Sequence, residues 1–198
     1  MTEYKLFTGN SYVSTYEYHK DRERAPHLEQ PAHRPRLFEA RNLVRRIPDY
    51  KKLLYSDLGC GDGGFLQLLH EDGIEQAWGY DFCPANAAGW VERGVTAHAQ
   101  DWTRQRHLGQ VVILTEVLEH LQDPHGELRR IARSGQTQWI VASSPANESD
   151  ASHCESHSWA WDYEGFANLF TTNGWSIVKH TLADWSQLVL AWKSPEDS

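Results

Sequence analysis

Residues 53–64 read LLYSDLGCGDGG, a short apolar run that ends in a cluster of glycines. The run LLYSDL (53–58) predicts a buried β-strand, and the next stretch, FLQLLHEDG (65–73), has the apolar spacing of a helix. Glycines between a strand and a helix let the backbone turn tightly and direct the amides of the helix N-terminus at a ligand. This stretch therefore predicts a strand–turn–helix unit with a ligand site at the turn.

Apolar runs and helical patterns alternate along the rest of the chain. Further strands are predicted at residues 77–82, 94–99, 110–115, 138–143, 175–182 and 185–193, and further helices at 36–47, 85–93, 116–133 and 162–173. Such alternation is typical of a parallel sheet covered by helices, and the short gap between the last two strands fits a tight hairpin. The sequence thus predicts an α/β fold: a Rossmann-like seven-stranded mostly parallel sheet with helices on both faces and an antiparallel C-terminal hairpin strand.

The composition excludes several classes of protein. The chain has 198 residues, enough for one domain, and a formal net charge of −8 from 27 acidic and 19 basic side chains. The N-terminal stretch lacks the apolar segment of a secretory signal, and no apolar run is long enough for a transmembrane helix. Three cysteines without a CxxC pair are typical of free, buried thiols in a reducing compartment. We therefore expect a cytoplasmic protein without a membrane partner and, because it is acidic, without a broad surface for duplex nucleic acid.

The glycine turn has candidate partners at two other positions. Residues 59–64 satisfy the pattern GxGxxG, and Asp81 closes the next predicted strand about 20 residues on, where a carboxylate accepts hydrogen bonds from ribose hydroxyls. This geometry fits nicotinamide and adenosyl ligands alike. Asp57, directly before the turn, places a carboxylate beside the ligand, which favours a ligand that carries an ammonium group and disfavours a pyrophosphate.

Four segments together resemble a known family. DLGCGDGG (57–64), GYDF (79–82), AQDW (99–102) and TEVLEHL (115–121) occur in the order and spacing of the class I S-adenosylmethionine-dependent methyltransferases, and the resemblance covers residues 53–145. The terminal hairpin is similar to the last two strands of that fold. The resemblance implies S-adenosylmethionine as the cofactor and S-adenosylhomocysteine as the product.

The resemblance also implies roles for residues around the turn. Gly59, Cys60 and Gly61 would lie against the cofactor. Asp57 would lie near the amino-acid end of the cofactor, and Glu116, at the end of the fourth strand, would line its methionine portion.

The adenosine end of the cofactor would be held by residues after the second and third strands. By position, Asp81 would hold the ribose hydroxyls and Phe82 would pack on the adenine. Asp101 would bind the adenine amino group, with Trp102 beside the ring.

We expect a single methyltransferase domain over residues 1–198, in three parts. Residues 1–40 are polar and rich in His, Arg and Pro, which fits an N-terminal cover or lid; residues 41–145 form the cofactor-binding core. Residues 146–198 supply an acceptor loop, a helix and the terminal hairpin.

A cluster of acidic residues and a histidine follows the strand predicted at 110–115. Glu116, Glu119 and His120 are at positions i, i+3 and i+4 of the predicted helix 116–133, so their side chains are expected on one face. Ligands bind at this carboxyl end of the strands in open α/β sheets. Acidic residues also stabilise a helix N-terminus, which is the purely structural alternative.

His157 lies on the long polar loop after the next strand, which is expected to open onto the same side of the sheet. We assign catalysis to His120, Glu119 and His157, with either histidine as a general base or a substrate contact and without a metal. Two carboxylates and two imidazoles can alternatively hold a divalent cation. Trp159 and Trp161, just beyond His157, are candidates for contacts with a flat acceptor.

The cluster also resembles that of the small-RNA 3′-terminal 2′-O-methyltransferases, which carry E-x-x-E-H after the fourth strand and a later histidine before an aromatic-x-Trp. By position, that resemblance implies a metal held by Glu116, Glu119, His120 and His157. The pattern EVLEHL recurs, however, in methyltransferases of small molecules that bind no metal. The net charge of −8 also disfavours RNA as a partner.

The sequence therefore favours an S-adenosylmethionine-dependent methyltransferase that acts on an oxygen or nitrogen atom of a small-molecule acceptor. The alternative is the metal-dependent RNA 2′-O-methyltransferase. A second alternative is an NAD-dependent oxidoreductase, which Asp57 and the lack of a substrate domain disfavour. A catalytically silent binding module would be free to lose Asp57, Asp81 and Asp101, and all three are intact.

Overall fold

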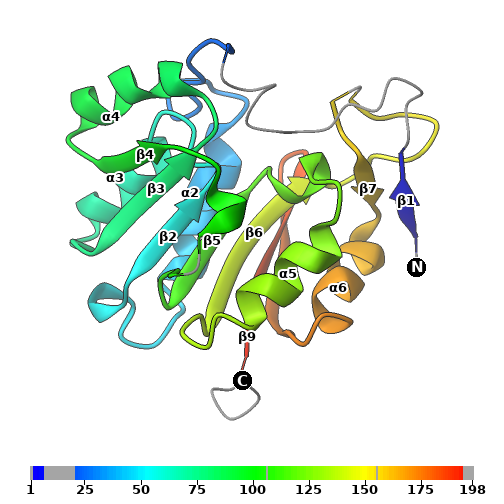
Figure 1. Ribbon diagram of the computed structural model, residues 1–198. Coiled ribbons are helices and arrows are strands. Elements are labelled where there is room, and N and C mark those ends of the chain that lie inside the picture. The colour runs from blue at the N-terminus through cyan, green and yellow to red at the C-terminus, as the bar shows by residue number, and fades with distance from the viewer. Residues whose placement is uncertain (1, 7–20, 106, 155, 194–198) are drawn as a thin grey trace.

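The computed structural model describes residues 2–6, 21–105, 107–154 and 156–193, and these form a seven-stranded sheet in the order β4-β3-β2-β5-β6-β9-β8 (Figure 1). The strands of this sheet are β2 (Tyr55–Leu58), β3 (Ala77–Asp81), β4 (Thr96–Ala99), β5 (Val111–Thr115), β6 (Trp139–Pro145), β8 (Ser176–Ala183) and β9 (Ser186–Trp192). Strands β2 to β6 pair in parallel, and β9 is antiparallel to both of its neighbours. The predicted mostly parallel sheet with an antiparallel C-terminal strand is confirmed.

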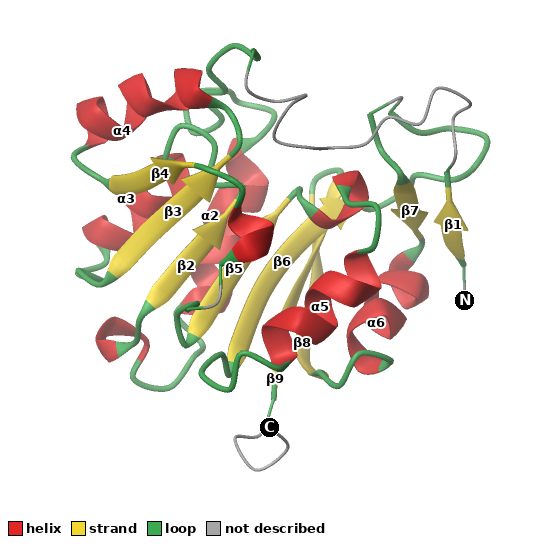
Figure 2. Cartoon of the chain, in the orientation of Figure 1, coloured by secondary structure: helices red, strands yellow, loops and turns green. Residues whose placement is uncertain are grey.

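Helices cover both faces of the sheet. They are α2 (Arg34–Val44), α3 (Gly64–Glu71), α4 (Ala87–Arg93), α5 (Pro124–Ala132) and α6 (Tyr163–Thr171), with short 3-10 turns η1 (Tyr50–Lys52), η2 (Pro84–Asn86), η3 (Trp102–Arg104) and η4 (Leu118–His120). In Figure 2, α5 and α6 lie in front of the sheet and α2 lies behind it. Among the described residues, none of these helices combines the length and the apolar character needed to cross a membrane.

The position of β5 in the middle of the sheet explains why its sequence is an apolar run. Its residues are all buried, and they alternate between two hydrophobic clusters. Val112 and Leu114 pack in the cluster under α5 and α6, whereas Val111 and Ile113 pack in the cluster under α2 and α3. Because each face of the strand meets its own layer of helices, neither face has room for polar residues.

The predicted helix over residues 116–133 is wrong, because two separate elements, η4 and α5, occupy that stretch. Glu116 has a left-handed backbone (φ 56°), so the chain turns before η4. Asp123 caps α5 by accepting a hydrogen bond from the Gly126 N–H, and Pro124 occupies the first turn. A proline disfavours helical geometry at the preceding residue, which separates α5 from η4.

A second, two-stranded sheet joins the N-terminal end of the chain to the loop after β6. Strand β1 (Glu3–Lys5) pairs antiparallel with β7 (Trp159–Trp161), and the Trp161 indole N–H donates to Glu3 Oε2 at 2.9 Å. The sequence did not predict this sheet because both strands are three residues long and show no periodicity. Residues 7–20 of the predicted N-terminal cover lie outside the described residues.

Asp72, at the C-terminal cap of α3, fastens α3 to α2. Its carboxylate accepts hydrogen bonds from Arg45 Nε at 2.7 Å and Nη2 at 2.6 Å, and from Arg41 Nη2 at 2.5 Å. The Arg45 guanidinium, followed by that of Arg41, holds the pKa of the Asp72 carboxyl well below its usual range. Asp72 is itself almost buried, so these bonds are shielded from water.

We predict that Asp72→Asn lowers the free energy of unfolding by about 1.5–3 kcal/mol at neutral pH, since hydrogen bonds to a charged group are lost. Because the folded-state pKa is depressed, the stabilisation is present above the unfolded pKa near about 4 and is lost as the pH falls below it. Urea denaturation at neutral pH and at a pH below the unfolded pKa measures the free energy of unfolding of each variant. The control is Asp49→Asn, whose exposed carboxylate pairs with exposed Lys52. An equally small loss in both variants at neutral pH contradicts the prediction.

Candidate functional site

A cavity of about 630 Å³ lies at the carboxyl ends of β2, β3 and β5. Strands β3 and β4 lie on one side of β2 in the sheet, and the next strands in the chain, β5 and β6, lie on its other side. Loops therefore leave β2 and β5 in different directions, and ligands of open α/β sheets bind where the strand order reverses in this way. The cavity is in the place that the sequence predicted for the ligand site.

The glycine turn after β2 forms one wall of this cavity. Gly59, Gly61 and Gly63 all have positive φ angles, of 78°, 53° and 86°, which residues with a Cβ rarely adopt. A Cβ on Gly59 would lie 2.6 Å from Val117 Cγ2. These three positions therefore favour glycine, and without side chains there the backbone of the turn can approach a ligand closely.

Asp57 lines the cavity with a carboxyl group whose two oxygens have no hydrogen-bond partner among the described residues. The residue is only 1% exposed. Burial, followed by the nearby charge of Asp81, raises the pKa of the Asp57 carboxyl to about 8. An unsatisfied buried carboxyl of this kind is suited to pair with a cationic group of a ligand.

Asp81 has the opposite environment at the end of β3. Its Oδ2 accepts from the Gly61 N–H at 2.9 Å, and its Oδ1 accepts from the Cys83 N–H at 2.7 Å and from Asn86 Nδ2 at 3.0 Å. These bonds fix the carboxylate against the glycine turn, at the cavity wall. Asn86 is a lining residue that the sequence analysis missed, since only the fold brings it to Asp81.

Two aromatic side chains form a flat apolar part of the wall. The rings of Phe82 and Trp102 are stacked at 5.5 Å with an interplanar angle of 15°, and both residues line the cavity. Asp101, predicted beside them, is not among the lining residues. Its carboxylate instead caps η3, accepting from the Thr103 N–H at 3.1 Å and pairing with Arg104 Nε at 3.1 Å.

The structure thus brings eight of the nine sequence-predicted cofactor residues to one cavity, with Asp101 as the exception. The eight are Asp57, Gly59, Cys60, Gly61, Asp81, Phe82, Trp102 and Glu116. Of the three free cysteines, Cys60 and Cys83 are buried as expected, whereas Cys154 is exposed, which corrects the expectation for that residue.

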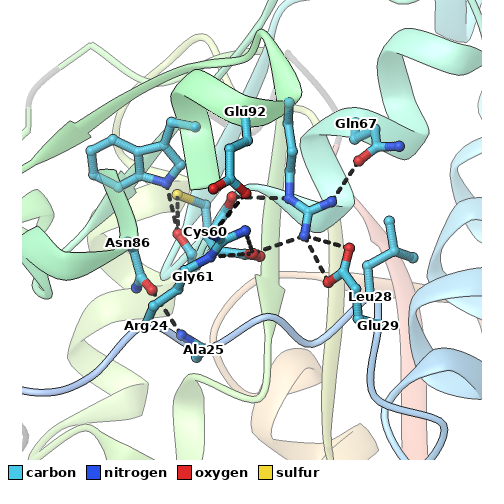
Figure 3. Close-up of polar contacts among 12 residues, drawn as sticks. Arg24, Ala25, Leu28, Glu29, Cys60, Gly61, Gln67, Asn86 and Glu92 are labelled. Carbon is cyan, nitrogen blue, oxygen red and sulfur yellow. Dashed lines mark hydrogen bonds and ion pairs between the residues drawn. The ribbon is translucent and has the colours of Figure 1, made fainter. Parts of the chain in front are cut away.

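The N-terminal segment before α2 lies against the glycine turn, as Figure 3 shows for Arg24 and Ala25 beside Gly61. Arg24 Nη2 pairs with buried Asp62 at 3.0 Å, and the Ala25 N–H donates to Asn86 Oδ1 at 3.0 Å. The segment contributes lining residues to the cavity, among them Ala25. Because its partners lie about 40–60 positions away along the chain, sequence spacing alone could not find these contacts.

A second cavity of about 570 Å³ adjoins the first, and His27, Glu116 and His120 line both. Other residues around the second cavity are His33, Arg36, Glu119, Glu148, His153, His157 and Trp185. Carboxylates, imidazoles and one guanidinium come together around this second cavity. A ligand in the first cavity and a ligand in the second would meet at the shared residues.

All three predicted catalytic residues come together in the second cavity. Glu119, His120 and His157 each offer one ligand atom, and these atoms all lie within 4.8 Å of one another. Glu119 is fully buried, and its carboxylate oxygens have no hydrogen-bond partner in the described part of the chain. Burial, followed by the charge of Glu116, raises the pKa of the Glu119 carboxyl well above its usual range.

Glu116 is not part of this group of three, so the expectation that Glu116, Glu119 and His120 share a helical face is wrong. With its left-handed backbone, Glu116 turns its Oε1 toward Ser143 Oγ at 2.7 Å and Ser186 Oγ at 3.3 Å. Both hydroxyls donate to the carboxylate. Burial raises the pKa of the Glu116 carboxyl.

Trp159 and Trp161 do not line either cavity, contrary to the prediction of contacts with an acceptor. Both lie in β7 within the hydrophobic core, with their rings stacked at 6.1 Å. Pairing with β1 turns these side chains into the core.

Comparisons with known proteins agree with this geometry. A family model described as a methyltransferase domain matches residues 32–188, more than half of the chain. No curated protein matches the sequence significantly.

Solved structures share the fold. Magnesium protoporphyrin IX methyltransferase from Synechocystis PCC 6803 with bound S-adenosylhomocysteine has a TM-score of 0.67 and 14% identity, and the match covers 90% of this chain and 93% of that one. The 1,6-didemethyltoxoflavin-N1-methyltransferase of Burkholderia thailandensis, with bound 1,6-didemethyltoxoflavin and S-adenosylhomocysteine, has a TM-score of 0.64 and 16% identity, with 84% and 80% covered. The chain therefore belongs to the methyltransferase-domain family, in agreement with the resemblance to class I S-adenosylmethionine-dependent methyltransferases in its sequence.

Proposed function

We propose that this protein is an S-adenosylmethionine-dependent methyltransferase that methylates an oxygen or nitrogen atom of a small-molecule acceptor. The observation that carries the proposal is the pair of adjoining cavities, one beside the glycine turn and one beside the histidines, with Glu116 and His120 lining both. Two similar structures hold S-adenosylhomocysteine, and one of these also holds a small-molecule acceptor. The family match supports methyl transfer.

The residues of the first cavity fit this cofactor. In the proposal, the unpartnered Asp57 carboxylate pairs with the ammonium group, the Asp81 carboxylate accepts from the ribose hydroxyls, and Phe82 with Trp102 packs on the adenine. When bound, the cofactor supplies a methyl group already activated by a sulfonium. The chain's own residues then have mainly to align the acceptor, and alignment is worth several kcal/mol of the barrier.

The second cavity supplies acceptor binding and proton removal. We assign the general base to His157, with His120 and Glu119 as neighbouring acceptor contacts, because the three converge in the second cavity and His120 also lines the first. A base in this place takes the proton of a hydroxyl or ammonium acceptor as it is methylated.

The metal-dependent RNA 2′-O-methyltransferase stays a second candidate because Glu119, His120 and His157 are close enough to hold one ion. The position of Glu116 counts against it, since hydrogen bonds from Ser143 and Ser186 hold its Oε1 outside that group. The alternative of a nicotinamide-dependent oxidoreductase is excluded, because the family match assigns the chain to methyltransferases.

A thermal-melt titration tests the proposed function directly. S-adenosylhomocysteine at 100-fold over its dissociation constant is expected to add about 2.7 kcal/mol and to raise Tm by roughly 5–11 °C. NADH at the same concentration is expected to leave Tm unchanged. A shift with NADH and none with saturating S-adenosylhomocysteine would falsify the proposal.

We predict that Asp57→Asn has opposite effects on cofactor affinity and stability. Affinity for S-adenosylhomocysteine falls by about 10- to 100-fold, because a charge-assisted hydrogen bond is lost. A carboxyl with a raised folded-state pKa costs stability once the pH exceeds its unfolded value near about 4. The ligand-free variant is therefore expected to be more stable than the native protein at pH 7 and equally stable near pH 4.

Calorimetric titration and urea denaturation measure the two effects. Asp72→Asn is the matched control, since it is expected to lose stability and keep its affinity. An Asp57→Asn variant that binds S-adenosylhomocysteine as tightly as the native protein contradicts the assigned role of Asp57.

Metal addition separates the two candidate functions. If the acceptor site works without a metal, Mn²⁺ leaves Tm unchanged in the native protein, and EDTA leaves methyl transfer unchanged. A Mn²⁺-dependent rise in Tm that disappears in His157→Ala would instead favour the RNA 2′-O-methyltransferase. The same titration in Glu116→Gln shows whether Glu116 belongs to such a site.

A further inference from the structure

Glu148, which no motif singled out, makes the closest polar contact of His157. It lies on the loop after β6, and its Oε2 is 2.5 Å from His157 Nδ1. The two side chains are only 16% and 11% exposed. Glu148 Oε1 accepts from the Cys154 N–H at 2.9 Å, so both oxygens of the carboxylate are engaged.

The loop that carries this pair is held in place by its own backbone. Ser149 and Ser152 form an antiparallel bridge, and the His157 N–H donates to the Cys154 carbonyl at 3.0 Å. The Ser158 N–H donates to the Glu119 carbonyl at 2.7 Å, which ties the loop to η4. Glu148 and His157 are therefore held at the cavity by contacts within the chain.

The contact between Glu148 and His157 determines which ring nitrogen carries a proton. An ionised carboxylate only accepts hydrogen bonds, so the neutral His157 ring must place its proton on Nδ1. Nε2 is then the nitrogen with the lone pair, which is the form that a general base requires. His157 lines the second cavity, which is where a general base would meet the acceptor.

We propose that Glu148 is a positioning residue that fixes the Nδ1–H tautomer of His157; the inference rests on the proposed function insofar as His157 is the base. As the acceptor oxygen or nitrogen forms its bond to the methyl carbon, the carbon–sulfur bond breaks and its electron pair stays on sulfur. The acceptor proton passes to His157 Nε2. The resulting imidazolium lies against the Glu148 carboxylate and returns the proton to water afterwards.

Glu148→Gln tests this because the glutamine cannot satisfy both partners as the carboxylate does. The Cys154 N–H can only donate, so the amide oxygen of the glutamine must face it. The amide NH₂ then faces His157 Nδ1. Because an amide N–H and a protonated Nδ1 are both donors, this contact favours the tautomer that carries its proton on Nε2. We therefore expect the variant to hold His157 in the tautomer that cannot act as a base.

The first readout is the tautomer itself. Long-range ¹H–¹⁵N spectra of the full-length protein, labelled at its histidines and recorded at alkaline pH, distinguish a protonated Nδ1 from a protonated Nε2. Comparison with His157→Ala assigns the signal among the 11 histidines. We expect a protonated Nδ1 in the native protein and in Glu148→Asp, and a protonated Nε2 in Glu148→Gln.

The second readout is catalysis. In Glu148→Gln, kcat is expected to fall by about 100-fold or more while affinity for S-adenosylhomocysteine is unchanged. Asp150→Asn, an exposed carboxylate on the same loop, is the matched control and is expected to keep the native tautomer and kcat. Part of the lost kcat is expected to return in Glu148→Asp, which keeps a carboxylate at this position.

The outcomes separate this inference from the proposed function. A protonated Nε2 on His157 in the native protein overturns the positioning role, whatever the enzyme's activity. A tautomer that switches in Glu148→Gln without a loss of kcat overturns the assignment of His157 as the base. Native protein that fails to bind S-adenosylhomocysteine contradicts the proposed function, while the tautomer measurement still decides the role of Glu148.

Discussion

The reversal of strand order around β2 is the constraint on which the rest of the structure depends. β2 pairs in parallel with β3 on one side and with β5 on the other. The loops that leave β2 and β5 therefore diverge, which opens a crevice at the end of the sheet. The glycine turn forms one wall of that crevice, and Glu116 with η4 forms another. The first cavity is placed by this one feature of the topology, and Glu116 and His120 carry it to the border of the second cavity.

Environment, rather than residue type, separates the acidic groups that support the fold from those available to a ligand. Two arginines satisfy the carboxylate of Asp72, which joins α3 to α2. Asp57 and Glu119 are more deeply buried than Asp72, yet their carboxylate oxygens have no partner in the described residues. Their raised pKa values express a cost to stability that a ligand can offset. Sites for binding therefore stand out as the places where the fold is least satisfied by itself.

The parts of this molecule that could be predicted from sequence are those set by local rules. Strand β5 is apolar because both faces are buried, and the turn after β2 needs glycine because of its positive φ angles. Prediction failed where a single residue overrode the pattern: Pro124 starts a new helix, and Glu116 takes a left-handed backbone, so the expected shared face does not form. The partnership of Arg24 with Asp62 was hidden because only tertiary packing brings them together.

The second cavity is lined by segments that lie far apart in the sequence, among them η4, the loop after β6 and α2. η4 contributes Glu119 and His120, the loop after β6 contributes Glu148 and His157, and α2 contributes Arg36. Burial and Glu116 raise the pKa of the Glu119 carboxyl, and the buried Arg36 guanidinium acts in the opposite direction by favouring its charged form. Charge in the cavity is thus balanced by residues that come from separate parts of the chain. Because these segments are held by the sheet but are not part of it, the acceptor site can change while the cofactor site stays the same.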